Sequence, residues 1–163
     1  MIYIAIFIIL LIFSAFFSGT ETAYFNIRQH RDETPERVKS ILNHPRRLLV
    51  SLLTGNTIVN VAMASLAAYF TIQYAHEHGW SESLLIFVEV IIVSAVVLIF
   101  GEILPKMAAI RQSEKFAEWV YSPLITMMKI LYPVAQGFYQ ATNLIIKLLP
   151  LRKEKIFDSE EEL

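Results

Sequence analysis

The chain has 163 residues, of which 55% are hydrophobic and 18% are charged, and its formal net charge is −1. Its mean hydropathy of +0.51 and its long uncharged blocks exclude an ordinary soluble domain, in which apolar residues form stripes on helices and strands. The absence of cysteine excludes disulfides and thiolate metal sites. We therefore expect an integral membrane protein with no nucleic-acid partner.

Three weakly charged blocks predict transmembrane helices at about residues 2–27, 48–74 and 83–106. The first 18 residues and Leu48–Tyr74 contain no charged residue, and the third block contains only Glu89 before Phe100. About 20 mostly apolar residues cross a bilayer, a length that the first block reaches if its helix continues to Ile27. Because this block lacks the basic start of a signal peptide, we interpret it as a span. Glu89 either lines an outer entrance or faces a partner helix.

The placement of Lys and Arg predicts the orientation in the membrane. The loop after the first span holds six basic residues, the loop at residues 75–83 holds none, and basic residues return after the third span. Cytoplasmic loops carry such an excess, which predicts a multi-pass protein of the plasma membrane with an external N-terminus and a cytoplasmic C-terminus. Tyr3 and Trp80 suit external interfacial anchors. The basic residues are Arg28, Arg31, Arg37, Lys39, Arg46 and Arg47 in the first loop, and Lys106, Arg111 and Lys115 after the third span.

Residues 121–149 admit two interpretations. The segment is long enough for a fourth crossing, but basic residues flank its end, and Pro123, Pro133 and Gly137 interrupt it. We expect amphipathic helices within about 112–149 that lie in the membrane interface, with two shorter pieces separated by these interruptions. A fourth crossing is the alternative.

A further interfacial helix is predicted at about residues 34–43, with Pro35 at its first helical position after a Thr34 cap. The predicted architecture is all-α: three spans with a belt of juxtamembrane helices on the cytoplasmic side. This membrane domain covers residues 1–151. Residues 152–163 have an acidic end and are predicted to be a linker to a cytoplasmic domain.

Polar residues interrupt the three apolar blocks at matching depths. Ser18 lies nine residues before Ile27, Asn56 lies eight residues after Leu48, and Glu102 lies nine residues before Arg111. At 1.5 Å per residue, all three sit about 12 to 14 Å above the cytoplasmic boundary. Asn60, four residues after Asn56, faces the same way. The sequence thus predicts one polar layer built from three spans.

This layer has the oxygen chemistry of a cation site. Ser and Asn side chains offer neutral oxygens, and Glu102 offers a carboxylate. Pro105 has no N–H to donate, so the Gly101 carbonyl loses its helical partner. Broken helices with free carbonyls build ion sites in membrane proteins. Mg²⁺, which requires octahedral oxygen ligands at roughly 2.1 Å, is a plausible occupant.

Each feature also has a purely structural interpretation. Asn in membrane helices forms interhelical hydrogen bonds worth about 1 kcal/mol. Glu102 and Lys106 are spaced to neutralise each other, and Pro105 alone would produce a kink. However, a carboxyl group within the membrane is costly and usually functional, so the shared depth favours a site.

Three motifs, taken in order, resemble the transmembrane domain of the CNNM/CorC family. They are SGTETA at Ser18–Ala23, GNTIVN at Gly55–Asn60 and GEILPK at Gly101–Lys106. The likeness covers the chain from Ile2 to about Leu151. The resemblance implies a homodimeric Mg²⁺ transporter in the membrane lipid, generally held to export Mg²⁺ in exchange for Na⁺, and not an enzyme.

The resemblance also implies which residues hold the ion. Ser18, Asn56, Asn60 and the backbone of Gly101 would ligate Mg²⁺. Glu102 would either ligate it directly or fix the broken helix and couple transport to Na⁺, and we favour the second role. Family members continue into a cytoplasmic CBS-domain pair that binds adenine nucleotide. The alternative function is a Mg²⁺-responsive regulator or membrane anchor for cytoplasmic domains, without transport of its own.

Overall fold

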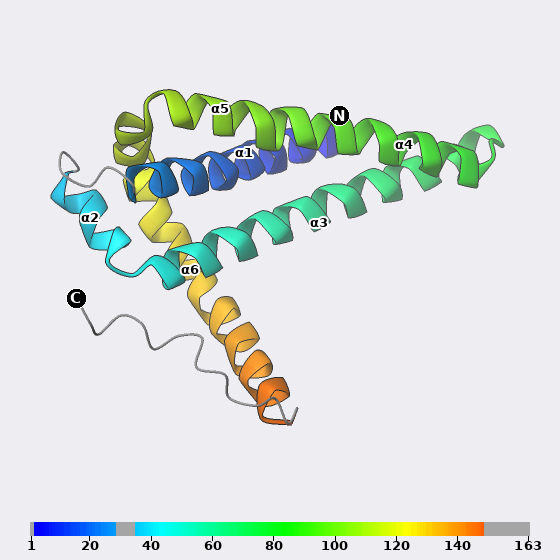
Figure 1. Cartoon of the computed structure of the whole chain (residues 1–163). Helices are drawn as coiled ribbons and strands as arrows, with labels where there is room; N and C mark the ends of the chain where they lie inside the picture. The colour runs from blue at the N-terminus through cyan, green and yellow to red at the C-terminus, as the bar shows by residue number, and fades with distance from the viewer. Residues whose placement is uncertain (1, 29–34, 149–163) are drawn as a thin grey trace.

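The chain is all-helical in the part that the structure describes, residues 2–28 and 35–148 of a computed structural model. Three long helical stretches run side by side (Figure 1). The third stretch changes from α-helix to π-helix and back without a break. The stretches are α1 (Ile2–Arg28), α3 (Pro45–His78), and the succession of α4 (Glu82–Val96), the π-helix η2 (Val97–Ile103) and α5 (Leu104–Arg111).

Each of these stretches is long and apolar enough to cross a membrane. The candidate spans are Ile2–Ile27, Arg47–His78 and Glu82–Arg111. No other helix among the described residues meets the same conditions of length, hydropathy and charge. The prediction of three apolar helices of spanning length is therefore confirmed. The second and third are longer than predicted, because both continue past the last apolar residue into polar sequence.

A tight turn joins α3 to α4. Gly79 adopts a left-handed conformation with φ of 67°, and the backbone N–H of Trp80 donates to the Ala75 carbonyl at 3.1 Å. This pattern is typical of a glycine that ends a helix. His76 Nε2 lies 3.2 Å from a carboxylate oxygen of Glu82 across the turn. The turn therefore sets α3 and α4 antiparallel.

Aromatic side chains gather at the end of the bundle that carries the N-terminus. The Tyr3 ring lies 6.3 Å from that of Tyr69 and 5.9 Å from that of Phe70. The Tyr74 and Trp80 rings lie 6.5 Å apart. Aromatic rings of this kind collect at membrane–water interfaces, which agrees with Tyr3 and Trp80 as interfacial anchors.

The last helix, α6 (Ser113–Leu148), differs from the prediction. It is one continuous helix of 36 residues with Pro123 and Pro133 inside it, so the expectation of two pieces is wrong. Both prolines are exposed, and one face of the helix buries Val120, Leu124 and neighbouring apolar residues. The missing N–H groups therefore lie away from the packed face. α6 runs at an angle to the three long helices (Figure 1) and is not a candidate span.

The short helix α2 (Glu36–Leu42) begins one residue later than predicted. Pro35 precedes the helix rather than opening it, and its carbonyl accepts the N–H of Val38 at 2.9 Å. The predicted Thr34 cap lies outside the described residues, as do residues 149–163, which include the predicted linker. Val38, Ile41 and Leu42 are buried, so α2 lies on the helix bundle as an amphipathic helix.

The packed core lies toward the ends of the long helices that meet α6. Its members come from α1, α2, α3, α5 and α6, and α4 contributes none. Outward-facing apolar side chains instead cover α4, which suits contact with lipid or with another apolar surface. The largest fully buried side chains are Tyr24, Leu52, Met63, Leu124, Val38 and Val120.

Candidate metal site between the three long helices

Ser14 is the centre of the polar contacts between α1 and α3. It is fully buried, and its hydroxyl lies 2.9 Å from Oδ1 of Asn60 and 3.2 Å from Oδ1 of Asn56. The two asparagines stand four residues apart, on one face of α3. They are half-buried and converge on the same hydroxyl. Three oxygen atoms from two helices therefore meet at one point.

The third stretch reaches the same point through Gly101. A Cβ atom built on Gly101 would lie 2.9 Å from Ser14 Oγ and 3.4 Å from Ser14 Cβ. Any larger residue would therefore displace the hydroxyl or the helix backbone. Gly101 is buried, so its backbone faces Ser14 directly. The structure thus brings Asn56, Asn60 and Gly101 together, as the sequence predicts.

The helix around Gly101 is widened rather than broken. Residues Val97–Ile103 form a π-helix, and the N–H of Leu104 donates back to the Ile99 carbonyl. The expectation of a helix interrupted at Pro105 is therefore wrong in form, since α5 continues through it. In a π-helix each N–H donates to the carbonyl five residues before it instead of four. The carbonyl that lacks a donor because of Pro105 therefore changes, and the helix continues. Such turns recur at functional sites.

Ser18 lies one turn further along α1, on the same helix face as Ser14. It is 1% exposed, and its hydroxyl has no hydrogen-bond partner among the described residues. The buried hydroxyl of Ser51 on α3 also has no hydrogen-bond partner among the described residues. A buried polar group without a partner costs about 1–3 kcal/mol. The hydroxyls of Ser18 and Ser51 are therefore free to accept a bond to an ion or a water molecule.

With the Asn56 and Asn60 amide oxygens turned toward Ser14, the electrostatics of the cluster favour a cation. The Ser14 hydroxyl has a single proton, which serves one acceptor well, whereas two Oδ1 atoms face it. The second acceptor and the unpartnered hydroxyl of Ser18 leave an excess of oxygen lone pairs in a buried place. With the Asn56 amide rotated by half a turn, its Nδ2 would donate to Ser14 and the cluster would be a plain hydrogen-bond network. A cation would stabilise the first arrangement, with two Oδ1 atoms facing Ser14, and not the second.

Close contacts fix the helices around this cluster. A Cβ at Gly55 would lie 2.5 Å from Phe17 Cζ and 2.9 Å from Leu131 Cδ1, so α1, α3 and α6 pack tightly there. A Cβ at Gly19 would lie 2.8 Å from Phe116 Cζ. Since Gly19 belongs to the first motif and Gly55 to the second, both motifs supply packing as well as oxygen atoms.

Glu102 stands apart from this network. It is half-buried and takes part in no hydrogen bond or ion pair with another described residue. The ion pair with Lys106, which the structural interpretation of Glu102 requires, is therefore absent from the described contacts. Groups of three or more His, Cys, Asp or Glu residues are also absent from the described part of the chain. Neutral oxygen atoms, rather than carboxylates, make up the cluster.

Sequence reasoning missed Ser14, which is the residue with most contacts in the site. A usable signal exists, because Ser14 precedes Ser18 by four residues and so shares its helix face. The contacts centre the site on Ser14 and not on Ser18. Ser14 lies four residues, or about 6 Å along the helix, nearer the N-terminal end of α1. The depth of a residue in its span therefore locates the polar layer only to within about one helical turn.

Comparisons with known proteins identify the family to which the chain belongs. A family model described as "Cyclin M transmembrane N-terminal domain" matches residues 5–163. A UPF0053 protein of Haemophilus influenzae is 25% identical over 96% of this chain and 38% of its own length. A UPF0053 inner membrane protein of Escherichia coli is 26% identical over 92% of this chain and 36% of its own length.

A chloroplastic DUF21 domain-containing protein of Arabidopsis thaliana is 28% identical over 95% of this chain and 24% of its own length. The chain thus spans between 24% and 38% of the length of these three relatives. The family model covers nearly every residue, including all three polar motifs. The chain therefore belongs to the cyclin M transmembrane domain family, which is also the DUF21/UPF0053 family.

Proposed function

We propose that the chain transports Mg²⁺ across the membrane through the oxygen cluster around Ser14. The family is a membrane-domain family associated with Mg²⁺ transport and not a catalytic one. The observation that carries the proposal is the approach of Asn56 and Asn60 to one buried hydroxyl, 3.2 Å and 2.9 Å away. Mg²⁺ is the transported substrate in this proposal.

The spacing of the oxygen atoms, which is that of two hydrogen bonds, is also compatible with Mg²⁺ as the ion. In an octahedron with metal–oxygen distances of roughly 2.1 Å, neighbouring ligand oxygens lie about 3.0 Å apart. The separations of Ser14 Oγ from the two Oδ1 atoms, 2.9 Å and 3.2 Å, are close to that edge length. Ser18 and the backbone of Gly101 would complete the set with further neutral oxygens. Because neutral ligands hold Mg²⁺ less tightly than several carboxylates, such a site would also release it.

We assign Glu102 a role in coupling rather than in direct ligation. It carries the negative charge of its motif but has no contact with the Ser14 cluster among the described residues. A carboxylate close to a dication site favours a cation electrostatically without contacting it. We propose export of Mg²⁺ in exchange for Na⁺, with Glu102 in the Na⁺-dependent step, in a homodimer whose cytoplasmic C-terminus leads to nucleotide-binding CBS domains.

A second candidate function is a Mg²⁺-responsive regulator or anchor that moves no ion. The observation that favours it is length, since the three relatives extend well beyond the part that matches this chain. In that case the ion would stabilise the packing of α1 on α3 and signal to attached domains. Both functions require Mg²⁺ binding, and only the first requires flux.

Flux through vesicles separates the two functions. The chain is reconstituted into liposomes that contain a Mg²⁺-sensitive dye, and Mg²⁺ is added outside with and without a Na⁺ gradient. Transport predicts entry that is lost in Asn60→Ala and retained in Ser65→Ala, because Ser65 is exposed on the same helix. Mg²⁺ binding by the parent protein without any entry would contradict transport and favour the regulator.

A further inference from the structure

An open groove of about 550 Å³ lies at the corner between α5 and α6, where its lining combines two kinds of side chain. Arg111, Gln112 and Lys115 supply the polar part. The apolar part consists of Leu104, Met107, Ala108, Phe116 and Trp119. The lining includes none of Ser14, Asn56, Asn60 and Gly101, so the groove is separate from the candidate metal site.

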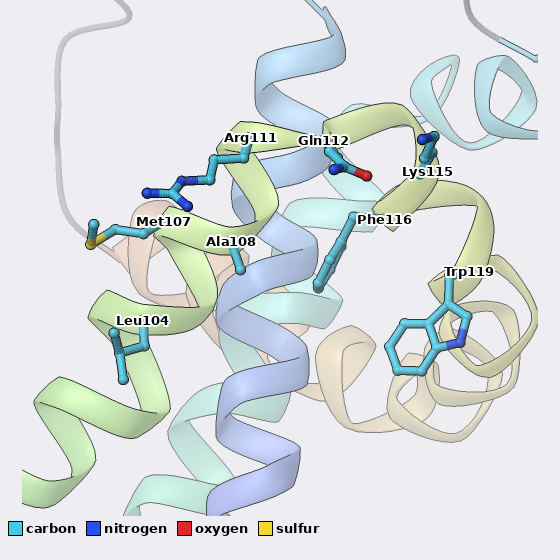
Figure 2. A pocket seen from close by; sticks show the side chains of 8 residues that line it. All are labelled: Leu104, Met107, Ala108, Arg111, Gln112, Lys115, Phe116 and Trp119. Carbon is cyan, nitrogen blue, oxygen red and sulfur yellow. The ribbon is translucent and has the colours of Figure 1, made fainter.

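The two kinds of lining are ordered along the helix axis. Figure 2 shows Arg111, Gln112 and Lys115 along one edge of the groove, with Leu104 and Trp119 furthest from that edge. Leu104 precedes Arg111 by seven residues, or about 10 Å along a helix. The candidate span ends at Arg111. The polar edge therefore lies where the span leaves the membrane, and the apolar part lies on the membrane side of it.

The polar edge is positively charged. Arg111 and Lys115 are exposed, and neither forms an ion pair with another described residue. Acidic side chains are absent from the groove's described lining. Glu114 lines a neighbouring hollow that shares Arg111, Gln112 and Lys115 with the groove. The first turn of α6 begins at Ser113, so its free N–H groups and helix dipole add to the positive potential.

The indole of Trp119 marks the boundary between the two media. Its side chain is 76% exposed and its ring lies 6.2 Å from that of Phe116. A large apolar ring with one polar N–H is favoured at the level of lipid headgroups. Lys and Arg at the cytoplasmic leaflet attract anionic lipids. The exposed indole and the two cations belong to the same groove, and both favour a lipid with an anionic headgroup.

We propose that this groove binds an anionic phospholipid. The phosphate lies between Arg111 and Lys115, and the start of an acyl chain lies along Leu104, Met107 and Trp119. A free phosphate ion would use only the polar edge and leave the apolar part open. A lipid uses both parts in the order in which the groove presents them, which is why we choose it over a soluble anion.

The test uses the fluorescence of Trp119 in vesicles. The chain has two tryptophans, so Trp80→Phe leaves Trp119 as its single tryptophan. This protein is reconstituted in phosphatidylcholine vesicles with increasing fractions of brominated phosphatidylglycerol or brominated phosphatidylcholine, whose bromine atoms quench a tryptophan in contact with the lipid. We expect phosphatidylglycerol to quench Trp119 at a several-fold lower fraction than phosphatidylcholine.

Substitution of the two cations should remove this preference. In R111Q/K115Q, the preference is expected to fall to about equal quenching by the two lipids, because each cation near the surface is worth up to roughly 1 kcal/mol, or about 5-fold. R111K/K115R keeps both charges and should retain it. R37Q/K39Q removes two positive charges from α2 instead, and this variant should also retain the preference for phosphatidylglycerol. Circular dichroism checks that the exposed substitutions leave the helices intact.

Three results would overturn the proposal. Equal quenching by the two lipids in the parent would exclude a preference for an anionic headgroup. An equal loss in R37Q/K39Q would assign the preference to general surface charge rather than to this groove. Reversal of phosphatidylglycerol quenching by millimolar glycerol phosphate would show a site for soluble phosphate and not for lipid. Mg²⁺ flux enters none of these readouts, so the proposal is tested independently of transport.

Discussion

Ser14 Oγ on α1 lies 2.9 Å from Asn60 Oδ1 on α3, and this contact joins two residues that are 46 positions apart in the chain. The same hydroxyl faces the backbone of Gly101 from the third stretch. One buried serine therefore links all three candidate spans. The account of this protein as a Mg²⁺ transporter depends on what Ser14 and its neighbours bind.

Ser14→Ala removes the hydroxyl that both asparagines face. Changes to groups that support a metal ligand typically cost about 10- to 100-fold in metal affinity, and we expect at least the lower figure for Mg²⁺ binding and flux. Binding is measured by isothermal titration in detergent, and flux in dye-loaded liposomes. The matched control is Ser65→Ala on the exposed face of α3. Parent-like binding in Ser14→Ala would contradict a role for this hydroxyl.

Gly101→Ala places a methyl group 2.9 Å from Ser14 Oγ. Because the neighbouring atom belongs to a short side chain on a packed helix, we expect the hydroxyl to be displaced and Mg²⁺ binding to be lost, with a destabilisation of about 1–3 kcal/mol. Gly137→Ala on α6 is the control, since a Cβ there meets no atom within 4 Å. It should stabilise the helix by about 0.5–1 kcal/mol. Thermal unfolding in detergent would contradict this prediction if the two variants behaved alike.

Gly55→Ala tests packing without touching an oxygen ligand. Its Cβ would meet Phe17 Cζ at 2.5 Å and Leu131 Cδ1 at 2.9 Å, so we expect a lower melting temperature, corresponding to about 1–3 kcal/mol. Phe17→Leu removes the ring atoms in question and should restore part of the lost stability when combined with Gly55→Ala. Additive losses in the double variant would show that the two residues do not meet.

Glu102→Gln separates the two roles open to this carboxyl group. If Glu102 couples transport to Na⁺, the variant should keep a Mg²⁺ affinity within a few-fold of the parent and lose the dependence of flux on the Na⁺ gradient. As a direct ligand it should instead lower Mg²⁺ affinity about 10-fold or more. Titration and gradient-dependent flux are measured on the same preparation. Glu114→Gln on the exposed start of α6 is the control for loss of a single acidic charge.

The sequence predicts the three long helices well because length and hydrophobicity determine whether a segment can span a membrane. The polar layer is also predicted, since residues at equal distances from the cytoplasmic boundary of their spans must meet at a similar depth. Asn56, Asn60 and Gly101 do converge. The prediction is less accurate about which serine is central, because depth does not specify how each helix is rotated about its axis.

Two other features depend on tertiary packing rather than on local sequence. Pro123 stands within a continuous α6, since the opposite face of the helix is buried there through Val120 and Leu124. The π-helix at Val97–Ile103 has no distinct sequence signal, and it forms where Gly101 packs against Ser14. Packing between helices overrides local propensity at both places.

The most direct test is a structure of the protein determined with saturating Mg²⁺ and again with Mg²⁺ replaced by Mn²⁺, whose anomalous scattering identifies the metal. The account predicts one peak between α1, α3 and η2, with oxygen atoms of Ser14 or Ser18, Asn56 and Asn60 at roughly 2.1 Å. A structure with no anomalous peak among the three helices, in which Ser14 is hydrogen-bonded only to Asn56 and Asn60 in both ions, would contradict it.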